Sequence, residues 1–249
     1  MNKRTLLLVA HGSSEFKGDN PVIQLAETLS KRNLFDNIIH AFLHQQPLLK
    51  DVLSQIQTQE LCVIPMFSGY GYITSELIPK ALDQVSSEIR VRIFDPIGTH
   101  SEIPNILAKQ ALSIVEKNSL KPKEVSVLIV GHGHTKNSKN ANQTIMLARS
   151  VQKVIHGANV DTAFIEEPPL ISNWAQNTTT KYLIVLPYLV GGGLHTQEDI
   201  PIMLGLVSGN YSKEPFSGPH YIQGHTIWYC RPYGFDGSLA DIILKIVSK

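Results

Sequence analysis

Three side chains in the second half of the chain, His132, Glu166 and His195, carry groups that can bind a metal ion or move a proton. Each follows a short apolar run that is typical of a buried strand. Two neutral imidazoles and a carboxylate suit a borderline divalent transition metal, and the same groups accept protons near neutral pH. A histidine that follows a strand can also be purely structural, and the residue types alone leave both alternatives open.

A run of three glycines, residues 191–193, lies just before His195. Glycine lets the backbone approach a flat or bulky ligand that side chains would block. Gly192 and Gly193 are therefore candidate substrate contacts.

Further polar residues lie beside these candidates. His134, two residues after His132, would point to the same side as that histidine if the chain stayed extended, and it is a candidate substrate contact. Glu167 competes with Glu166 for the carboxylate role. Asp199 lies four residues after the second histidine, where an aspartate can cap helix amides and orient the loop.

An internal repeat places these residues in register with the first half of the chain. The matching blocks, at offsets of 121 or 122 residues, are LLLVAHGS 6–13 with VLIVGHGH 127–134, AFLHQQPLL 41–49 with AFIEEPPLI 163–171, and VIPMFSGYGYITSELIP 63–79 with VLPYLVGGGLHTQEDIP 185–201. They pair His11 with His132, His44 with Glu166, and Ile73 with His195. A fourth match, FDPIG 94–98 with CRPYG 230–234, has an offset of 136, so the second half carries extra residues. The Gly, Ser and Pro rich stretch 205–219 is their expected place, as a surface lobe or lid.

Both halves alternate short β-branched runs with stretches of helical periodicity, which predicts an α/β fold. Strands are predicted at 5–10, 37–43, 61–66, 89–94, 126–131, 159–165, 182–188 and 226–230, and helices at 21–31, 46–56, 75–86, 104–117, 141–154, 198–207 and 237–247. Strands that are apolar on both faces indicate parallel sheets flanked by helices. The prediction is two similar domains, 1–120 and 121–249, with a polar break near 118–123. Ligands of such sheets bind beyond the carboxyl ends of the strands, so a cleft between the two domains is expected.

Composition narrows the function classes. The 249 residues include 22 Lys and Arg against 21 Asp and Glu, a balance that gives no reason to expect nucleic acid or an anionic membrane as partner. No apolar run approaches the roughly 20 residues of a membrane span. Cys62 and Cys230 lie in separate apolar runs without metal-ligand spacing, which favours a reducing, cytoplasmic location.

The segments VAHGS, VGHGH and PYLVGGGLHTQEDIP resemble the class II tetrapyrrole chelatases, the group of sirohydrochlorin cobaltochelatases and ferrochelatases. The resemblance covers nearly the whole chain in its two-domain form. It implies paired chelatase domains similar to a periplasmic binding protein, and insertion of Fe²⁺ or Co²⁺ into sirohydrochlorin or a related tetrapyrrole, in siroheme or cobalamin biosynthesis. Carried over by position, His132, Glu166 and His195 would bind the ion and help remove the pyrrole protons.

The duplicated positions indicate that the second half is active. Ile73 replaces a histidine in the first half and can neither ligate nor accept a proton. His11 is kept and is expected to contact substrate. Tyr70, Tyr72 and Tyr188 are candidates for stacking on the macrocycle, with packing in the core as the alternative for each.

The leading hypothesis needs no cofactor beyond the substrate metal, and a homodimer is one option for the assembly. The chain contains no GxxxxGK[ST] loop, which argues against an ATP-driven chelatase. A non-catalytic tetrapyrrole or metal carrier with the same cleft is the alternative from another class. A phosphatase that uses the His-Gly motifs is disfavoured, because Ala10 and Gly131 stand where an RHG motif has its phosphate-binding arginine.

Overall fold

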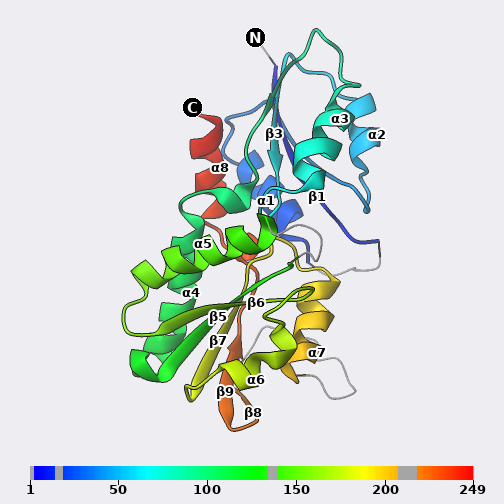
Figure 1. The fold of residues 1–249 in the computed structure, drawn as a ribbon. Coiled ribbons are helices and arrows are strands. Elements are labelled where there is room, and N and C mark those ends of the chain that lie inside the picture. The colour runs from blue at the N-terminus through cyan, green and yellow to red at the C-terminus, as the bar shows by residue number, and fades with distance from the viewer. Residues whose placement is uncertain (1–2, 15–18, 134–138, 207–217, 249) are drawn as a thin grey trace. The chain divides into compact units, whose positions relative to one another are not determined.

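Strands that alternate with helices along the chain form two sheets in this computed structural model (Figure 1). The structure describes residues 3–14, 19–133, 139–206 and 218–248. These residues form two compact units, 1–100 with 234–249 and 101–233. Each unit has its own sheet and its own apolar core.

The sheet of the first unit is parallel throughout, as predicted. Its strands are β1 (Arg4–Ala10), β2 (Asn37–Phe42), β3 (Glu60–Pro65) and β4 (Arg90–Ile93), in the order β2-β1-β3-β4. The helices of this unit are α1 (Pro21–Ser30), α2 (Leu49–Ser54), α3 (Ile78–Leu82) and α8 (Leu239–Val247). The middle of β1 is completely buried, as expected of a strand covered by side chains on both faces.

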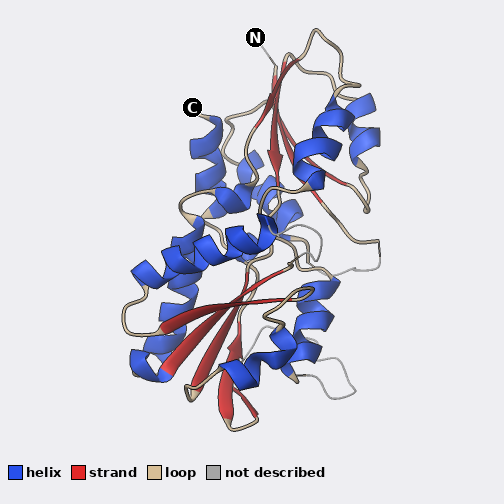
Figure 2. Ribbon diagram, viewed as in Figure 1, coloured by secondary structure: helices blue, strands red, loops and turns tan. Residues whose placement is uncertain are grey.

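The second sheet repeats this order and adds one strand. It consists of β5 (Val125–Gly131), β6 (Asn159–Phe164), β7 (Tyr182–Pro187), β9 (His225–Tyr229) and β8 (His220–Ile222), in the order β6-β5-β7-β9-β8. The helices are α4 (Ile103–Lys117), α5 (Lys139–Val154), α6 (Trp174–Asn177) and α7 (Ile200–Leu204) (Figure 2).

The antiparallel edge strand β8 was not expected. It pairs with β9 through a two-residue turn in which Gln223 and Gly224 both have positive φ, 50° and 82°, as a hairpin turn of type I′ requires. The extra residues of the second half therefore end in this hairpin. Most of the stretch predicted as a lobe or lid, residues 207–217, lies outside the described residues.

The compact units do not coincide with the sequence repeats. Helix α4 closes the first repeat but packs on α5 and β7 of the second unit, whereas α8 closes the second repeat and packs on α1 of the first unit (Figure 1). The position 120/121 thus marks the boundary between the sequence repeats. The compact units instead divide after residue 100 and again after residue 233. Both helices are amphipathic, and an apolar stripe does not say which sheet it covers. The cleft expected between the domains stays a prediction.

Three of the predicted helices differ from the observed ones in their bounds: the helix after the third strand of each repeat, and α2. A π-helical turn, Ile73–Leu77 in one unit and His195–Asp199 in the other, precedes α3 and α7. Helix α2 starts later than predicted because the two residues before it pair with the end of β2: the Phe42 amide donates to the carbonyl of Pro47, and Leu48 forms a parallel bridge with Phe42. Over the described residues, no helix combines the length and the apolar character that crossing a membrane requires.

Candidate active site

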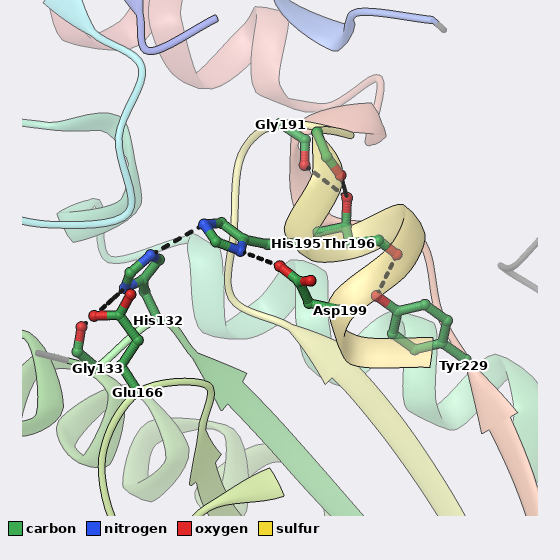
Figure 3. Close-up of polar contacts among 9 residues, drawn as sticks. His132, Gly133, Glu166, Gly191, His195, Thr196, Asp199 and Tyr229 are labelled. Atoms are coloured by element: carbon green, nitrogen blue, oxygen red, sulfur yellow. Dashed lines mark hydrogen bonds and ion pairs between the residues drawn. The ribbon is translucent and has the colours of Figure 1, made fainter. Parts of the chain in front are cut away.

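The second unit brings His132, Glu166 and His195 to the same edge of its sheet. His132 follows the central strand β5, Glu166 lies two residues past β6, and His195 begins the π-helical turn after β7. Because β6 and β7 flank β5 in a parallel sheet, the carboxyl ends of all three strands meet at this edge. The predicted juxtaposition of the two histidines is therefore present (Figure 3).

A hydrogen bond to the backbone sets the proton position on His132. Its Nδ1 lies 2.9 Å from the carbonyl oxygen of Gly133, and since a carbonyl can only accept, Nδ1 carries the hydrogen. The neutral ring then presents an unprotonated Nε2. Gly133 makes this turn possible, because its φ is +76° and an added Cβ would lie 2.9 Å from Cγ of Glu167.

A carboxylate sets the proton position on His195 in the same way. Nδ1 of His195 donates to Oδ2 of Asp199 at 2.6 Å, so the neutral ring again presents an unprotonated Nε2 (Figure 3). Asp199 was expected to cap amides or orient the loop, and its direct contact with the imidazole is what sequence reasoning missed. The signal was present, because side chains four residues apart lie on one face of a helical turn.

The π-helical turn that carries His195 is fixed from inside the fold. Thr196 is 1% exposed, and its Oγ1 donates to the carbonyl of Gly193 at 2.9 Å. The hydroxyl of Tyr229, on β9, donates to the carbonyl of Thr196 at 2.8 Å. These contacts hold the backbone on both sides of the imidazole.

The two unprotonated nitrogens face one another. Nε2 of His132 lies 3.2 Å from Nε2 of His195, and the rings meet edge to face (Figure 3). Two lone pairs at this distance repel unless a proton or a cation lies between them. An ion about 2.1 Å from each nitrogen would be bound at an angle of roughly 100°, close to tetrahedral or octahedral coordination. The side chains are 36% and 46% exposed, so solvent reaches both.

Glu166 lies beside this pair without joining it. Its Oε2 is 3.7 Å from Nδ1 of His132, on the edge of the ring away from Nε2. Among the described residues, no three His, Cys, Asp or Glu side chains converge as metal ligands. The structure therefore assembles two of the three expected donors, and ligation by Glu166 stays a prediction.

The glycine loop leaves open space. A Cβ added at Gly193 would have no described atom within 4 Å, and one at Gly191 would meet only the Gly193 nitrogen, at 3.9 Å. The fold itself therefore does not require glycine at these two positions, which supports a loop that leaves room for a ligand. Gly192 is buried.

The three tyrosines differ in environment. Tyr188 is 4% exposed and stacks on Tyr233 with ring centroids 5.8 Å apart, so core packing is the correct alternative and macrocycle stacking by Tyr188 is not supported. Burial raises the pKa of Tyr188 well above the ordinary value. Tyr72 is 73% exposed and keeps its ring available. Partial burial and a hydrogen bond with Asp95 raise the pKa of Tyr70 to about 12.

Two remaining predictions concern His134 and His11. His134 lies outside the described residues. His11 follows β1 and repeats the geometry of its counterpart, with Nδ1 2.9 Å from the carbonyl oxygen of Gly12.

Comparisons with known proteins place this chain in a family. The sequence model of the CbiX family matches residues 5–113 and 126–249. A probable sirohydrochlorin cobaltochelatase of Halobacterium salinarum is 27% identical over 265 residues, which cover 97% of this chain and 90% of that protein.

Solved structures show the same fold. A CbiX described as the terminal enzyme for biosynthesis of siroheme in denitrifying bacteria has a TM-score of 0.72 at 20% identity, with 98% of each chain covered. A multi-domain protein of Deinococcus radiodurans, with structural similarity to chelatases and two additional domains, has a TM-score of 0.76 at 23% identity over 99% of this chain. This chain spans 55% of that protein. The family match extends over both repeats and confirms the resemblance seen in the motifs: the chain belongs to the CbiX family.

Proposed function

We propose that this chain is an ATP-independent chelatase that inserts Fe²⁺ or Co²⁺ into sirohydrochlorin or a closely related tetrapyrrole. The observation that carries the proposal is the pair of facing Nε2 atoms of His132 and His195, 3.2 Å apart at the carboxyl edge of a parallel sheet. Membership of the CbiX family and the name of the Halobacterium relative support the choice of substrate.

The reaction exchanges one divalent ion for two pyrrole protons, so metal ligands and proton acceptors are needed together. Two imidazoles, each with an unprotonated Nε2, can first hold the ion. When the ion moves to the ring nitrogens of the macrocycle, each imidazole nitrogen is freed and can take one proton. The divalent ion takes two positive charges away from the pair of histidines, and the two protons bring two positive charges to it.

Two carboxylates support the protonated state of the pair. Asp199 accepts from Nδ1 of His195 at 2.6 Å, and Glu166 lies 3.7 Å from Nδ1 of His132. Each carboxylate therefore stabilises one imidazolium, which offsets the repulsion between two cations at this distance. Since both histidines are partly exposed, the protons can pass on to solvent.

The donor set also fits transient binding. Imidazole suits Fe²⁺ and Co²⁺, whereas thiolates would hold the ion more tightly and are typical of structural sites. Cys62 is buried within its strand, and burial raises the pKa of the Cys230 thiol to about 12. Neither cysteine is suited to act as a thiolate ligand here.

Anaerobic incubation of sirohydrochlorin with Co²⁺ or Fe²⁺ and a small molar fraction of the protein tests the proposal. We expect the absorption spectrum of the metallated ring to grow through many turnovers with either ion. His132→Ala should abolish that turnover, while His156→Ala, at an exposed histidine outside the site, should retain it. A spectrum that stops changing after one equivalent would identify a carrier instead.

A further inference from the structure

The second unit contains a cavity of about 280 Å³ between its sheet and the short helix α6. It is lined by the beginning of β5, the middle of β6, and Trp174 of α6. His132 follows the opposite, carboxyl end of β5, and none of the described residues that line the cavity belongs to the candidate active site. The volume is close to the lower end for small-molecule sites, about 300 Å³.

The two units keep one register, an offset of 122 residues, through this region. Oγ1 of Thr58 and Oγ1 of Thr180 lie 3.1 and 3.0 Å from the carbonyl oxygen two residues further along the chain. The bridge of Leu48 with the end of β2 has its counterpart in the bridge of Leu170 with the end of β6. Residues between these points can therefore be compared position by position.

The first unit fills the equivalent place with apolar side chains. Ile39 and Asp161 hold the same register position on the second strand of their sheets. Ile56 and Thr178 are likewise equivalent at the offset of 122. Both isoleucines pack against the core of the first unit, whereas Asp161 and Thr178 line the cavity. A carboxylate and a hydroxyl in place of two packed isoleucines give up apolar burial, which indicates a binding site rather than a packing solution.

The walls of the cavity are held in place by the fold. Trp174 is 3% exposed and packs edge to face on His225, with ring centroids 5.4 Å apart. Nδ1 of His225 donates to the carbonyl of Thr180 at 2.8 Å. Oγ1 of Thr178 donates to the carbonyl of Trp174 at 2.8 Å. The aromatic wall and the hydroxyl are therefore positioned before any ligand arrives.

Charge and polarity define the kind of ligand. Among the described lining residues, Asp161 is the only one with an ionisable side chain, and it is exposed. The side-chain amide of Asn159 donates to its Oδ2, and a carboxylate has further acceptor sites. The interior is apolar, with Leu128 and Leu183 buried beside the indole of Trp174.

We propose that this cavity binds a small organic cation of the alkylammonium type. The ammonium group pairs with the Asp161 carboxylate, and the apolar stem lies against the indole of Trp174. A carboxylate at the opening favours a cation and repels an anion, while the apolar interior selects an organic cation over a hydrated metal ion.

An NMR titration of the full chain with n-butylammonium chloride, without metal or tetrapyrrole, tests this proposal. The chain has two tryptophans, of which Trp174 lines the cavity and Trp228 does not, and Trp228→Phe assigns their indole resonances. We expect the Trp174 resonance to shift to saturation in the millimolar range, because so few atoms make contact, and the Trp228 resonance to stay unchanged. Neutral 1-butanol and sodium butyrate have similar stems and should bind about 10-fold more weakly or not at all.

Variants separate the charge from the space. Asp161→Asn keeps the shape and should weaken butylammonium binding about 10-fold or more, while Asp83→Asn, at an exposed aspartate of the first unit, should leave it unchanged. Asp161→Ile combined with Thr178→Ile restores the residues of the first unit and should abolish binding. Absence of a saturable shift, equal binding of 1-butanol, or unchanged affinity in Asp161→Asn would overturn the site. Because neither metal nor tetrapyrrole is present, the result does not depend on the proposed function.

Discussion

Asp199 and His195 form a hydrogen bond of 2.6 Å within one π-helical turn, from Nδ1 of the ring to Oδ2 of the carboxylate. The turn is closed by the Ile200 amide, which donates to the carbonyl of His195 five residues back. The carboxylate therefore fixes both the tautomer and the direction of the ring. The Nε2 that faces His132 depends on it.

The first unit contains the same kind of π-helical turn without the histidine and the aspartate. A π-helical turn occurs at Ile73–Leu77, where Thr74 is 9% exposed and its Oγ1 donates to the carbonyl of Gly71 at 3.1 Å. Thr196 has the same role in the second unit. Ile73 and Leu77 stand where His195 and Asp199 stand, so the histidine and the aspartate are both absent there.

Removal of the Asp199 carboxylate should therefore reduce insertion. Partners that orient a metal-binding histidine typically contribute about 10- to 100-fold to metal affinity or activity, and we expect a loss of that size for Asp199→Ala. Asp199→Asn keeps an acceptor for Nδ1 and should lose less. The control is Glu198→Gln on the same turn. Steady-state kcat and KM for Co²⁺ decide the matter, and a wild-type rate in Asp199→Ala would contradict a positioning role.

The two halves should respond unequally to loss of a histidine. His132→Ala and His195→Ala each remove one of the facing nitrogens and should nearly abolish metal insertion. His11→Ala should have a smaller effect, because Ile73 leaves the first unit without the matching histidine. The measurement is the initial rate of metallation under anaerobic conditions. Equal losses from His11→Ala and His195→Ala would count against the second unit as the active one.

Glu166→Gln separates proton transfer from metal ligation. The Glu166 carboxylate lies 3.7 Å from Nδ1 of His132, so its loss should lower kcat while Co²⁺ binding without tetrapyrrole stays near the wild-type level. Glu167→Gln, at the neighbouring residue, is the matched control. If Glu166→Gln weakens Co²⁺ binding as much as His132→Ala does, the carboxylate is a ligand, as the family resemblance implies.

The sequence repeat was sufficient to predict the strand ends and the two facing histidines. Matching blocks place residues at equivalent strand ends, and parallel neighbours then bring them together. It could not say which edge of a ring faces which partner, because that depends on side-chain rotation. Glu166, which was expected among the ligands, lies on the Nδ1 edge of His132, and its ligation of the ion stays a prediction.

Packing between segments far apart in the chain was likewise invisible in the pattern. The periodicity of α4 and α8 correctly predicts two amphipathic helices. It does not show that α4, from the first repeat, packs in the second unit, or that α8, from the second repeat, packs in the first unit. Helix α6, with four residues, is too short to show a period. The strand β8 has three residues and follows the undescribed 207–217, so its hairpin shows only in the structure.

Tyr229→Phe tests whether the buried hydroxyl stabilises the turn. Its hydroxyl donates to the carbonyl of Thr196 at 2.8 Å, and loss of a buried hydrogen bond costs about 1 to 3 kcal/mol of unfolding free energy. Tyr221→Phe is the control, since Tyr221 is 79% exposed. Urea unfolding compares the two variants. Equal midpoints would mean that the hydroxyl does not hold the turn.

Two glycine substitutions should have opposite consequences. Gly133 has φ +76° and no room for a Cβ, so Gly133→Ala should destabilise the fold by about 1 to 2 kcal/mol or more, the cost of a left-handed backbone. Gly193 has neither constraint, because no described atom lies within 4 Å of its added Cβ. The unfolding free energy of Gly193→Ala should therefore lie within about 0.5 kcal/mol of the wild-type value. If the macrocycle occupies that space, the same variant should raise KM for sirohydrochlorin, and a KM unchanged from wild type would show that the glycine loop does not contact the substrate.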